Sequence, residues 1–203
     1  MIDKIKEFSW YQTIDFGDGI ISKGCPWCGD PAWKNIIKFL PDSLFGMRIL
    51  DLGSNAGIFC IRSILLGAKE VIGIESNDWK KDNYFEQALF VKDFFEKKYN
   101  KKFNIHYIQE RMENFLERKD IGKFDYVYGI ASLYYSFASE QTVEGISKIT
   151  DNAIIRVRDK NRIKKFYDLF IKYGFICVDE LREKWWEILD RKTDDFYLFH
   201  FKK

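Results

Sequence analysis

The chain has 203 residues, a length typical of one domain with an additional segment. Its 33 basic and 31 acidic residues nearly balance, which argues against a protein built only to bind a polyanion. With 46% hydrophobic, 32% charged and 18% aromatic residues, the composition indicates a folded chain with a large core and rings left to line a pocket.

No apolar run approaches the roughly 18 residues that a membrane span needs, and residues 1–7 lack the apolar core of a signal peptide. The four cysteines are too few for a disulfide-rich secreted domain. We therefore expect a cytoplasmic protein with no membrane partner.

The N-terminal segment differs in composition from the rest of the chain. All three prolines lie before residue 42, and residues 9–31 are rich in glycine, so this stretch predicts a loop-rich structure. We assign residues 1–31 to an N-terminal lid or substrate segment and residues 32–203 to a regular domain. Apolar residues at helical spacing predict a first helix at residues 32–40.

The regular domain alternates between two kinds of pattern. Short apolar runs predict seven strands, at residues 47–52, 71–75, 103–108, 124–130, 153–157, 175–178 and 196–201. Apolar stripes predict helices at residues 56–66, 80–98, 112–118 and 161–173. This alternation specifies βαβ units, and no long helix separates the last two strands. We expect an α/β fold with a doubly wound, mostly parallel seven-stranded sheet whose last strand is antiparallel.

The first junction between a strand and a helix carries the strongest sign of a ligand site. Asp51 comes near the end of an apolar strand, Gly53 follows, and Gly57 stands where the helix starts. Ligands of open parallel sheets bind beyond the carboxyl ends of the strands, where glycine lets the backbone approach a ligand closely. Glu75 ends the second strand, 24 positions after Asp51, where a carboxylate can accept hydrogen bonds from ribose hydroxyls.

The glycine spacing distinguishes between nucleotide ligands. The segment from Gly53 to Gly57 lacks the central glycine of the dinucleotide motif G-x-G-x-x-G, and the chain has no phosphate-binding G-x-x-x-x-G-K-[S/T] loop. A turn with no pyrophosphate to hold suits S-adenosylmethionine, a nucleoside with a cationic sulfonium and an amino-acid tail.

Further runs add a family resemblance: Phe124-Asp-Tyr-Val127 enters the fourth strand, Ile130-Ala-Ser-Leu-Tyr134-Tyr135 follows it, and Tyr173-Gly-Phe175 precedes the sixth. With them, residues 33–201 resemble the class I S-adenosylmethionine-dependent methyltransferases, which have a Rossmann-like fold. The resemblance implies a transferase that binds S-adenosylmethionine. It places Asp51, Gly53 and Gly57 beside the methionine tail, Glu75 on the ribose, and Met112 and Glu113 at the adenine. The other expected cofactor residues are Ser54, Asn55, Ser76 and Ile130.

A narrower resemblance lies upstream. The runs Phe8-Ser-Trp10-Tyr11 and Asp30-Pro-Ala-Trp33 are similar to the segment before the core of the tRNA wobble-uridine carboxymethyltransferases and their relatives. Tyr135 stands where those enzymes typically have a histidine, so we expect ordinary methyl transfer to a small molecule, such as a sugar or metabolite hydroxyl. The alternatives are a tRNA-modifying enzyme, with RNA as partner, and a non-catalytic protein that binds a nucleoside or a partner.

Methyl transfer from a sulfonium depends mainly on positioning, and a general base is needed only if the acceptor must lose a proton. Tyr134, Tyr135 and Asp15 are the catalytic candidates, and we expect Tyr134 to lie within contact distance of the methyl group or else to form a pocket wall. Trp10, Tyr11 and Arg156 are the substrate-binding candidates, because rings can cover a site and arginine can clamp an acidic group. Packing over the sheet edge and ion pairing are the alternatives for these three.

The motif Cys25-Pro-Trp-Cys28 suggests a zinc or redox site. A structural zinc needs four ligands, and the other cysteines and both histidines fall within predicted regular elements. A redox C-x-x-C should follow a strand and open a helix, whereas Pro26 and Gly29 predict a loop. We therefore expect no metal, and the sequence leaves the oligomeric state open.

Overall fold

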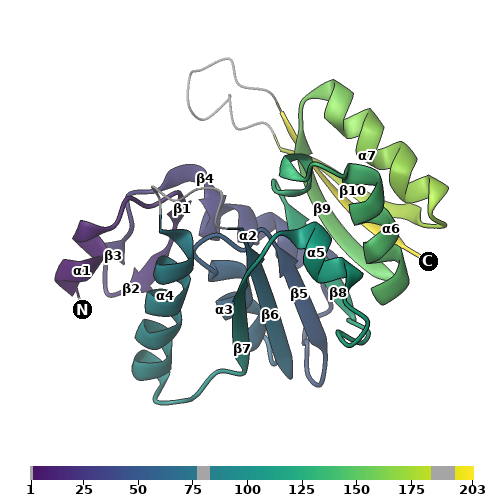
Figure 1. The fold of residues 1–203 in the computed structure, drawn as a ribbon. Helices are drawn as coiled ribbons and strands as arrows, with labels where there is room; N and C mark the ends of the chain where they lie inside the picture. The colour runs from purple at the N-terminus through teal and green to yellow at the C-terminus, as the bar shows by residue number, and fades with distance from the viewer. Residues whose placement is uncertain (1, 77–82, 184–194) are drawn as a thin grey trace.

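The computed structural model describes residues 2–76, 83–183 and 195–203, and a seven-stranded sheet forms its centre (Figure 1). The strand order is β10-β11-β9-β8-β5-β6-β7, with β11 antiparallel to both of its neighbours and the other pairs parallel. The strands are β5 (Arg48–Leu52), β6 (Glu70–Glu75), β7 (Ile105–Gln109), β8 (Tyr126–Ile130), β9 (Asn152–Arg158), β10 (Ile176–Glu183) and β11 (Phe196–Lys202). This architecture confirms the predicted fold class.

The predicted helices are all found close to their expected positions. Those described are α2 (Asp30–Ile36), the 3₁₀ helix η1 (Ile37–Phe39), α3 (Ile58–Leu65), α4 (Tyr84–Tyr99), α5 (Met112–Glu117) and α7 (Lys160–Lys172). The first three residues of the helix predicted at 80–98 lie outside the described residues. The sequence interpretation missed α6 (Ser139–Ile149), whose polar sequence is interrupted by Gly145. A Cβ at Gly145 would lie 2.8 Å from the Leu116 side chain, so this glycine lets α6 pack closely on α5.

Two apolar cores cover the two faces of the sheet. Successive residues of β5 belong to different cores: Ile49 packs with residues of α2, α3 and α4, whereas Leu50 packs with residues of α5, α6 and α7. Side chains of a strand point alternately to opposite faces, which explains this division. The buried strands are therefore apolar almost throughout, as expected for a parallel sheet covered on both sides.

The N-terminal segment is more regular than its glycine and proline content predicts. It contains α1 (Ile2–Glu7), β1 (Gln12–Thr13), β2 (Asp15–Gly17), β3 (Ile20–Ile21) and β4 (Cys25–Gly29), with β1 paired to β4 and β2 to β3. A Cβ at Gly24 would lie 2.3 Å from the Gln12 backbone, and one at Gly29 would lie 2.3 Å from the Thr13 carbonyl oxygen. These glycines therefore serve the close approach of two strands and correct the prediction of a loop.

The segment is fixed to the domain by aromatic packing and by an ion pair. Phe16 lies with its ring centroid 4.8 Å from that of Phe94 on α4. The guanidinium of Arg62 on α3 donates to both carboxylate oxygens of Asp30, each at 2.7 Å. Asp30 also accepts a hydrogen bond from the Asp15 backbone N–H at 2.7 Å, so one carboxylate joins α2, α3 and β2.

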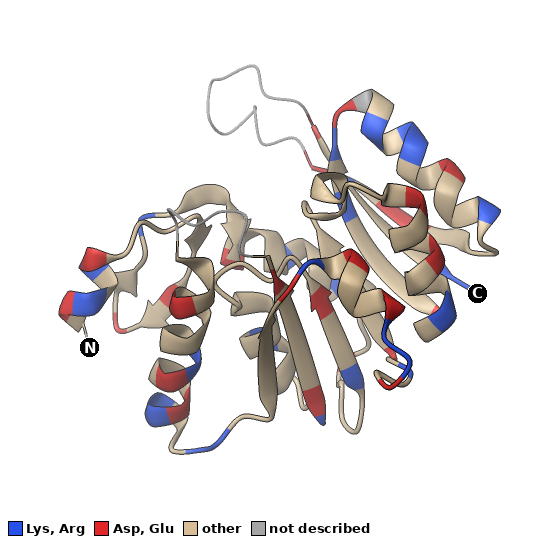
Figure 2. Ribbon diagram, in the orientation of Figure 1, with Lys and Arg blue, Asp and Glu red and all other residues tan. Residues whose placement is uncertain are grey.

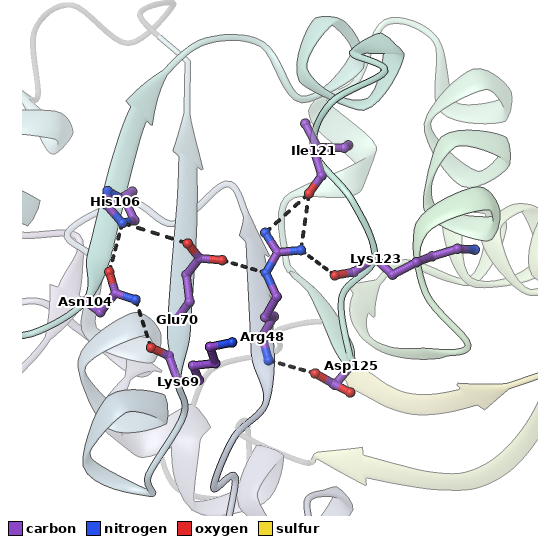
Figure 3. A network of polar contacts seen from close by, with 8 residues as sticks. All are labelled: Arg48, Lys69, Glu70, Asn104, His106, Ile121, Lys123 and Asp125. Atoms are coloured by element: carbon purple, nitrogen blue, oxygen red, sulfur yellow. Dashed lines mark hydrogen bonds and ion pairs between the residues drawn. The ribbon is translucent and has the colours of Figure 1, made fainter.

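A polar network joins the amino ends of the central strands (Figure 3). The Arg48 side chain donates to Glu70 Oε2 at 2.6 Å and to the Lys123 carbonyl at 2.6 Å, while its backbone N–H donates to Asp125 Oδ2 at 2.7 Å. These contacts link β5 to β6 and to the segment that leads into β8. The network therefore stabilises the order of the strands at the end of the sheet where they begin.

Charged residues are concentrated on the helices and at the strand ends, and the middle of the sheet carries few of them (Figure 2). Within the described ranges, no helix combines the length and apolar character that crossing a membrane requires.

Candidate functional site

A cavity of about 600 Å³ lies where β5, β6 and β8 end. Most of its wall comes from five parts of the chain: the N-terminal segment, the turn after β5, the end of β6, the segment before and within α5, and the segment after β8. Phe59 of α3 and Tyr84 of α4 add to it. Arg156 of β9 completes it. The lining residues are Tyr11, Gln12, Cys28, Gly29, Gly53, Asn55, Phe59, Ile74, Glu75, Ser76, Tyr84, Glu110, Arg111, Met112, Glu113, Ile130, Ala131, Ser132, Tyr134, Tyr135, Ser136, Phe137 and Arg156. The volume is in the range of pockets that bind small molecules or cofactors.

The turn between β5 and α3 is held by backbone hydrogen bonds to β6. The N–H groups of Gly53 and Ser54 donate to the Ile74 carbonyl at 2.8 and 2.9 Å. Gly53 has a φ of 77°, and a Cβ there would lie 2.4 Å from the Cβ of Ser132. Glycine is therefore required both by the backbone conformation and by the close packing of the turn against the segment after β8.

Glu75 connects the turn to the end of β6. Its carboxylate accepts hydrogen bonds from the Asn55 N–H at 2.7 Å and from the Ser76 N–H at 3.0 Å, and the residue is 9% exposed. These bonds fix the carboxylate at the cavity wall. It can accept hydrogen bonds from a polar ligand because an ionised carboxylate offers about four acceptor positions.

The opposite side of the cavity is aromatic and includes one buried cation. Tyr134 and Tyr135 lie on the 3₁₀ helix η2 (Leu133–Tyr135), with ring centroids 4.6 Å apart. Arg156 is 1% exposed, and its Nε donates to Glu183 Oε2 at 2.8 Å. Burial raises the pKa of Tyr134 and of Tyr11, so both phenols are protonated at neutral pH and act as hydrogen-bond donors or ring surfaces.

Comparison with solved structures assigns this arrangement to a fold. An S-adenosylmethionine-dependent methyltransferase from Mesorhizobium loti has a TM-score of 0.63 at 15% identity, covering 86% of this chain and 99% of that one. The N-terminal domain of EvdMO1 with SAH bound has a TM-score of 0.69 at 13% identity, covering 100% and 94%. The chain has the S-adenosylmethionine-dependent methyltransferase fold. The [4+2]-cyclase SpnF has the same fold, with a TM-score of 0.63 at 10% identity, covering 100% of this chain and 91% of that one.

Sequence comparison points to a narrower group over part of the chain. The curated tRNA U34 carboxymethyltransferase of Alcanivorax borkumensis is 29% identical over 109 residues, which is 54% of this chain and 30% of that protein. The corresponding enzyme of Alteromonas mediterranea is 27% identical over the same shares. The match therefore spans less than a third of the length of these relatives. No protein-family model matches the chain.

The methyltransferase fold brings most of the predicted cofactor residues to the cavity. Those that line it are Gly53, Asn55, Glu75, Ser76, Met112, Glu113 and Ile130. Glu113 is held there because its Oε1 accepts hydrogen bonds from Ser136 Oγ and from the Phe137 N–H, both at 2.9 Å. This bond pair joins α5 to the segment that follows η2.

Three predicted cofactor residues do not line the cavity. Asp51 is 1% exposed beneath the turn, where its Oδ2 accepts a hydrogen bond from Cys60 Sγ at 3.6 Å. Burial raises its pKa to about 7, and the negative charge of Glu75 adds to the increase. Ser54 is also buried. A Cβ at Gly57 would lie 2.1 Å from Tyr107 Oη, so this glycine serves the packing of α3 on β7, whereas we had expected it to serve the approach of a ligand.

The catalytic and substrate candidates are divided in the same way. Tyr134, Tyr135, Tyr11 and Arg156 line the cavity, whereas Asp15 and Trp10 do not. Asp15 is exposed on β2, where its Oδ1 accepts a hydrogen bond from the Gly17 N–H at 2.8 Å. Trp10 is buried in the N-terminal segment, and its indole N–H donates to the Ile5 carbonyl at 2.6 Å. Both residues help to fix the N-terminal segment on the domain, since Trp10 packs against Phe90 of α4 and the Asp15 carbonyl accepts a hydrogen bond from Arg62 of α3.

The sequence interpretation missed several cavity residues, chiefly Glu110 and Arg111 before α5, Tyr84 at the start of α4, and Phe137 after η2. Arg111 could have been found, because it directly precedes the predicted Met112 and Glu113. Its guanidinium lies 4.3 Å from the centroid of the Phe137 ring. Tyr84 and Phe137 come from segments without a recognisable motif, and only the folded chain places them here.

Proposed function

We propose that the chain is an S-adenosylmethionine-dependent methyltransferase that transfers a methyl group to a small-molecule acceptor. The observation that carries the proposal is the position of the Glu75 carboxylate. It is fixed at the cavity wall by the turn after β5, in a fold that a solved relative uses to bind SAH. A buried carboxylate at the end of the second strand of such a sheet is suited to the hydroxyls of a ribose.

The residues present fit this cofactor by their chemistry. Gly53 and Asn55 would face the amino-acid tail, Glu75 the ribose, and Met112 with Glu113 the adenine. The rings of Tyr11, Tyr134 and Tyr135 would surround the sulfonium, since aromatic faces attract cations. When bound, S-adenosylmethionine would supply a methyl group already activated toward nucleophiles.

The protein's part in the reaction is mainly to hold an acceptor in line with the methyl group. Well-oriented groups can contribute on the order of 7–11 kcal/mol through proximity and orientation. We propose that the side of the cavity formed by Tyr11, Tyr134 and Arg156 holds the acceptor. A phenol with a raised pKa is a poor general base, so we expect the two tyrosines to orient the acceptor, and the proton of an acceptor hydroxyl to leave through solvent.

Calorimetric titration with S-adenosylmethionine, S-adenosylhomocysteine and the carboxy analogue of S-adenosylmethionine tests the cofactor assignment. We expect the first two to bind and the carboxy analogue to bind more weakly. The lysines of the N-terminal segment, Lys4, Lys6 and Lys23, do not line the cavity, and Arg156 is already paired with Glu183. Binding of none of the three would contradict the proposal and would favour a non-catalytic protein.

Transfer to tRNA is the second candidate function, and the similarity to two tRNA U34 carboxymethyltransferases favours it. Incubation with methyl-labelled S-adenosylmethionine, a metabolite extract and total tRNA separates the two candidates. Label in the small-molecule fraction supports our proposal. Label in tRNA, or tighter binding of the carboxy analogue, supports the second candidate.

A further inference from the structure

The buried cation of the cavity wall is paired inside the protein. Arg156 of β9 donates through Nε to Glu183 Oε2 at 2.8 Å, and its Nη2 lies 2.7 Å from the same oxygen. Glu183 ends β10, and both side chains are buried. The guanidinium also lies 3.8 Å from the centroid of the Phe196 ring on β11, the strand between β9 and β10. Contacts from two strands therefore fix the orientation of the Arg156 side chain.

Glu183 is itself held from a second side. The Asn35 side chain of α2 donates to Glu183 Oε1 at 2.9 Å, so each carboxylate oxygen accepts a hydrogen bond from a different element. A carboxylate held in this way keeps its charge beside Arg156. Replacing a buried ion pair with apolar residues often costs no stability, so stability alone does not explain why a charged pair lies at the cavity.

The pairing decides which ligand groups suit this end of the cavity. A buried guanidinium without a partner would bind a carboxylate or phosphate through two parallel hydrogen bonds. Here Glu183 already supplies the negative charge, so a second anion would meet a neutral pair. Donors remain, because Nη2 of Arg156 has no hydrogen bond of good geometry within the described ranges, and the phenols of Tyr11 and Tyr134 line the same cavity. Such donors suit the oxygen of a hydroxyl or carbonyl group.

The neighbouring charged groups do not restore a site for an anion. Arg158 and Arg162 lie near Tyr134, but both are exposed and neither lines the cavity, so water and salt screen their charges. The Cys28 thiol lines the cavity and can only add negative charge. Arg111 lines it too, but it follows β7, at the other edge of the sheet from β10.

We propose that Glu183 is a specificity-determining residue, which orients and neutralises Arg156 so that this end of the cavity takes an uncharged acceptor with hydroxyl or carbonyl oxygens. The inference rests on the proposed function, because it names the class of acceptor for that methyl transfer. A carboxylate or phosphate is disfavoured, since it would lose its hydration without gaining an unpaired cation. Glu183 does not line the cavity and acts through Arg156 as a positioning residue.

Glu183→Gln tests the inference, because it keeps an oxygen for Asn35 and removes the charge that neutralises Arg156. The probes are S-adenosylmethionine and its carboxy analogue, whose extra carboxylate is on the transferred carbon and would face the acceptor side. In calorimetric titrations, we expect the variant to favour the carboxy analogue over S-adenosylmethionine by about tenfold more than the original chain does, the worth of one charge-assisted hydrogen bond. Binding of S-adenosylhomocysteine, which lacks the transferred group, verifies that the variant is folded.

Asp195→Asn is the matched control. It breaks a more exposed ion pair, in which Arg182 of β10 donates through Nε to Asp195 Oδ2 at 2.6 Å. This change should leave the ratio of the two affinities as it is in the original chain. An unchanged ratio in Glu183→Gln, or an equal change in both variants, would overturn the inference while leaving the cofactor assignment intact.

A second measurement needs no substitution. The labelled product that the original chain makes from a metabolite extract should pass through an anion exchanger at neutral pH, and mild alkali should not release its label as methanol. Retention on the exchanger, release of methanol from a methyl ester, or label in tRNA would show an acidic acceptor and overturn the inference. If no analogue binds and no label is transferred, the proposed function fails, and this inference fails with it.

Discussion

The two ends of the central sheet satisfy their polar groups differently. At the amino ends, the Arg48 side chain reaches Glu70 and the carbonyls of Ile121 and Lys123, and the neighbouring His106 bonds with Asn104 (Figure 3). At the carboxyl ends, four buried atoms have no hydrogen bond among the described residues: Asp51 Oδ1, Ser54 Oγ, Glu110 Oε2 and Arg156 Nη2. Nearer the amino ends there is one such atom, Nε2 of His200, whose ring lies against that of Tyr126. Arg156 Nη2 still lies 2.7 Å from Glu183 Oε2, so only its hydrogen-bond geometry is poor.

A strained backbone conformation also occurs at one of the carboxyl ends. Ala131, directly after β8, has a φ of 56°, a left-handed conformation that costs a residue with a side chain about 1–2 kcal/mol. Strained residues and unpaired polar groups persist where a ligand site needs them. The comparison indicates that contacts at the amino ends of the strands stabilise the fold, whereas the carboxyl ends form a cavity at some cost in stability.

The largest expected effect at the carboxyl ends is the pH dependence of the free energy of unfolding that Asp51 causes. Asp51 has a pKa of about 7 in the folded chain, mainly because of burial. Its value in the unfolded chain is about 3.9. The folded state therefore binds this proton more tightly than the unfolded state does. The protonated Asp51 contributes fully to the free energy of unfolding below about pH 4, and this contribution is lost as the pH rises through about 7. Relative to Asp51→Asn, the original chain should lose up to about 4 kcal/mol over this range.

Urea unfolding of both proteins across this pH range measures the difference. Asn is nearly isosteric with Asp and does not titrate, so it controls for every other ionisable group. A difference in unfolding free energy that does not change with pH would show that Asp51 is not protonated in the folded chain.

Two glycines with the same backbone conformation test the packing of the carboxyl end. Gly46 and Gly53 have φ values of 79° and 77°, but a Cβ at Gly46 meets no atom within 4 Å, whereas one at Gly53 lies 2.4 Å from Ser132 Cβ. We expect Gly46→Ala to cost about 1 kcal/mol, from backbone strain alone. Gly53→Ala should cost about 3 kcal/mol and weaken ligand binding, because strain and overpacking add. Equal losses of unfolding free energy would disprove the role assigned to the Ser132 contact.

Two glutamates on β6 are expected to have different roles, one in ligand affinity and the other in the stability of the fold. Glu75 ends the strand at the cavity, and Glu70 begins it in the Arg48 network. We expect Glu75→Gln to weaken S-adenosylhomocysteine binding by about 1.5–3 kcal/mol, because hydrogen bonds to a charged acceptor are lost. Glu70→Gln should leave that affinity unchanged and reduce the free energy of unfolding by at most about 1 kcal/mol, the usual worth of a partly exposed ion pair. Calorimetry and urea unfolding on both variants check this, and unchanged affinity in Glu75→Gln would remove Glu75 from the cofactor site.

The same contrast explains what the sequence could predict. Strands such as β5 and β6 were recognisable because their apolar runs are long and end at a glycine or a charge. The candidate site followed from them, because the carboxyl ends of parallel strands meet at one edge. Gly53 and Glu75 were therefore predictable as neighbours, although a helix of just over two turns and a strand separate them along the chain.

The rest depended on contacts between distant segments. Glu183 lies on the part of β10 beyond the predicted end at residue 178, so its pairing with Arg156 could not be foreseen. The glycines of the N-terminal segment were interpreted as turns, although Gly24 and Gly29 allow two strands to approach. Local composition does not distinguish these two uses of glycine, because both require the absence of a side chain.

The smallest expected effect concerns the titration of the Cys28 thiol. Among the described residues, the charged and titratable groups that affect it are Cys25, Tyr11 and Arg156, and Tyr134 is nearby. The alkylation rate of Cys28 should rise with pH around a midpoint of about 7, because only the thiolate reacts. Tyr11→Phe keeps the ring but removes one donor to the sulfur, so the midpoint should move upward. Tyr135→Phe is the matched control, since that ring lies at the same cavity but is not among the groups that affect the Cys28 thiolate. A midpoint near that of Cys177, or an equal shift in both variants, would mean that the cavity does not stabilise the thiolate.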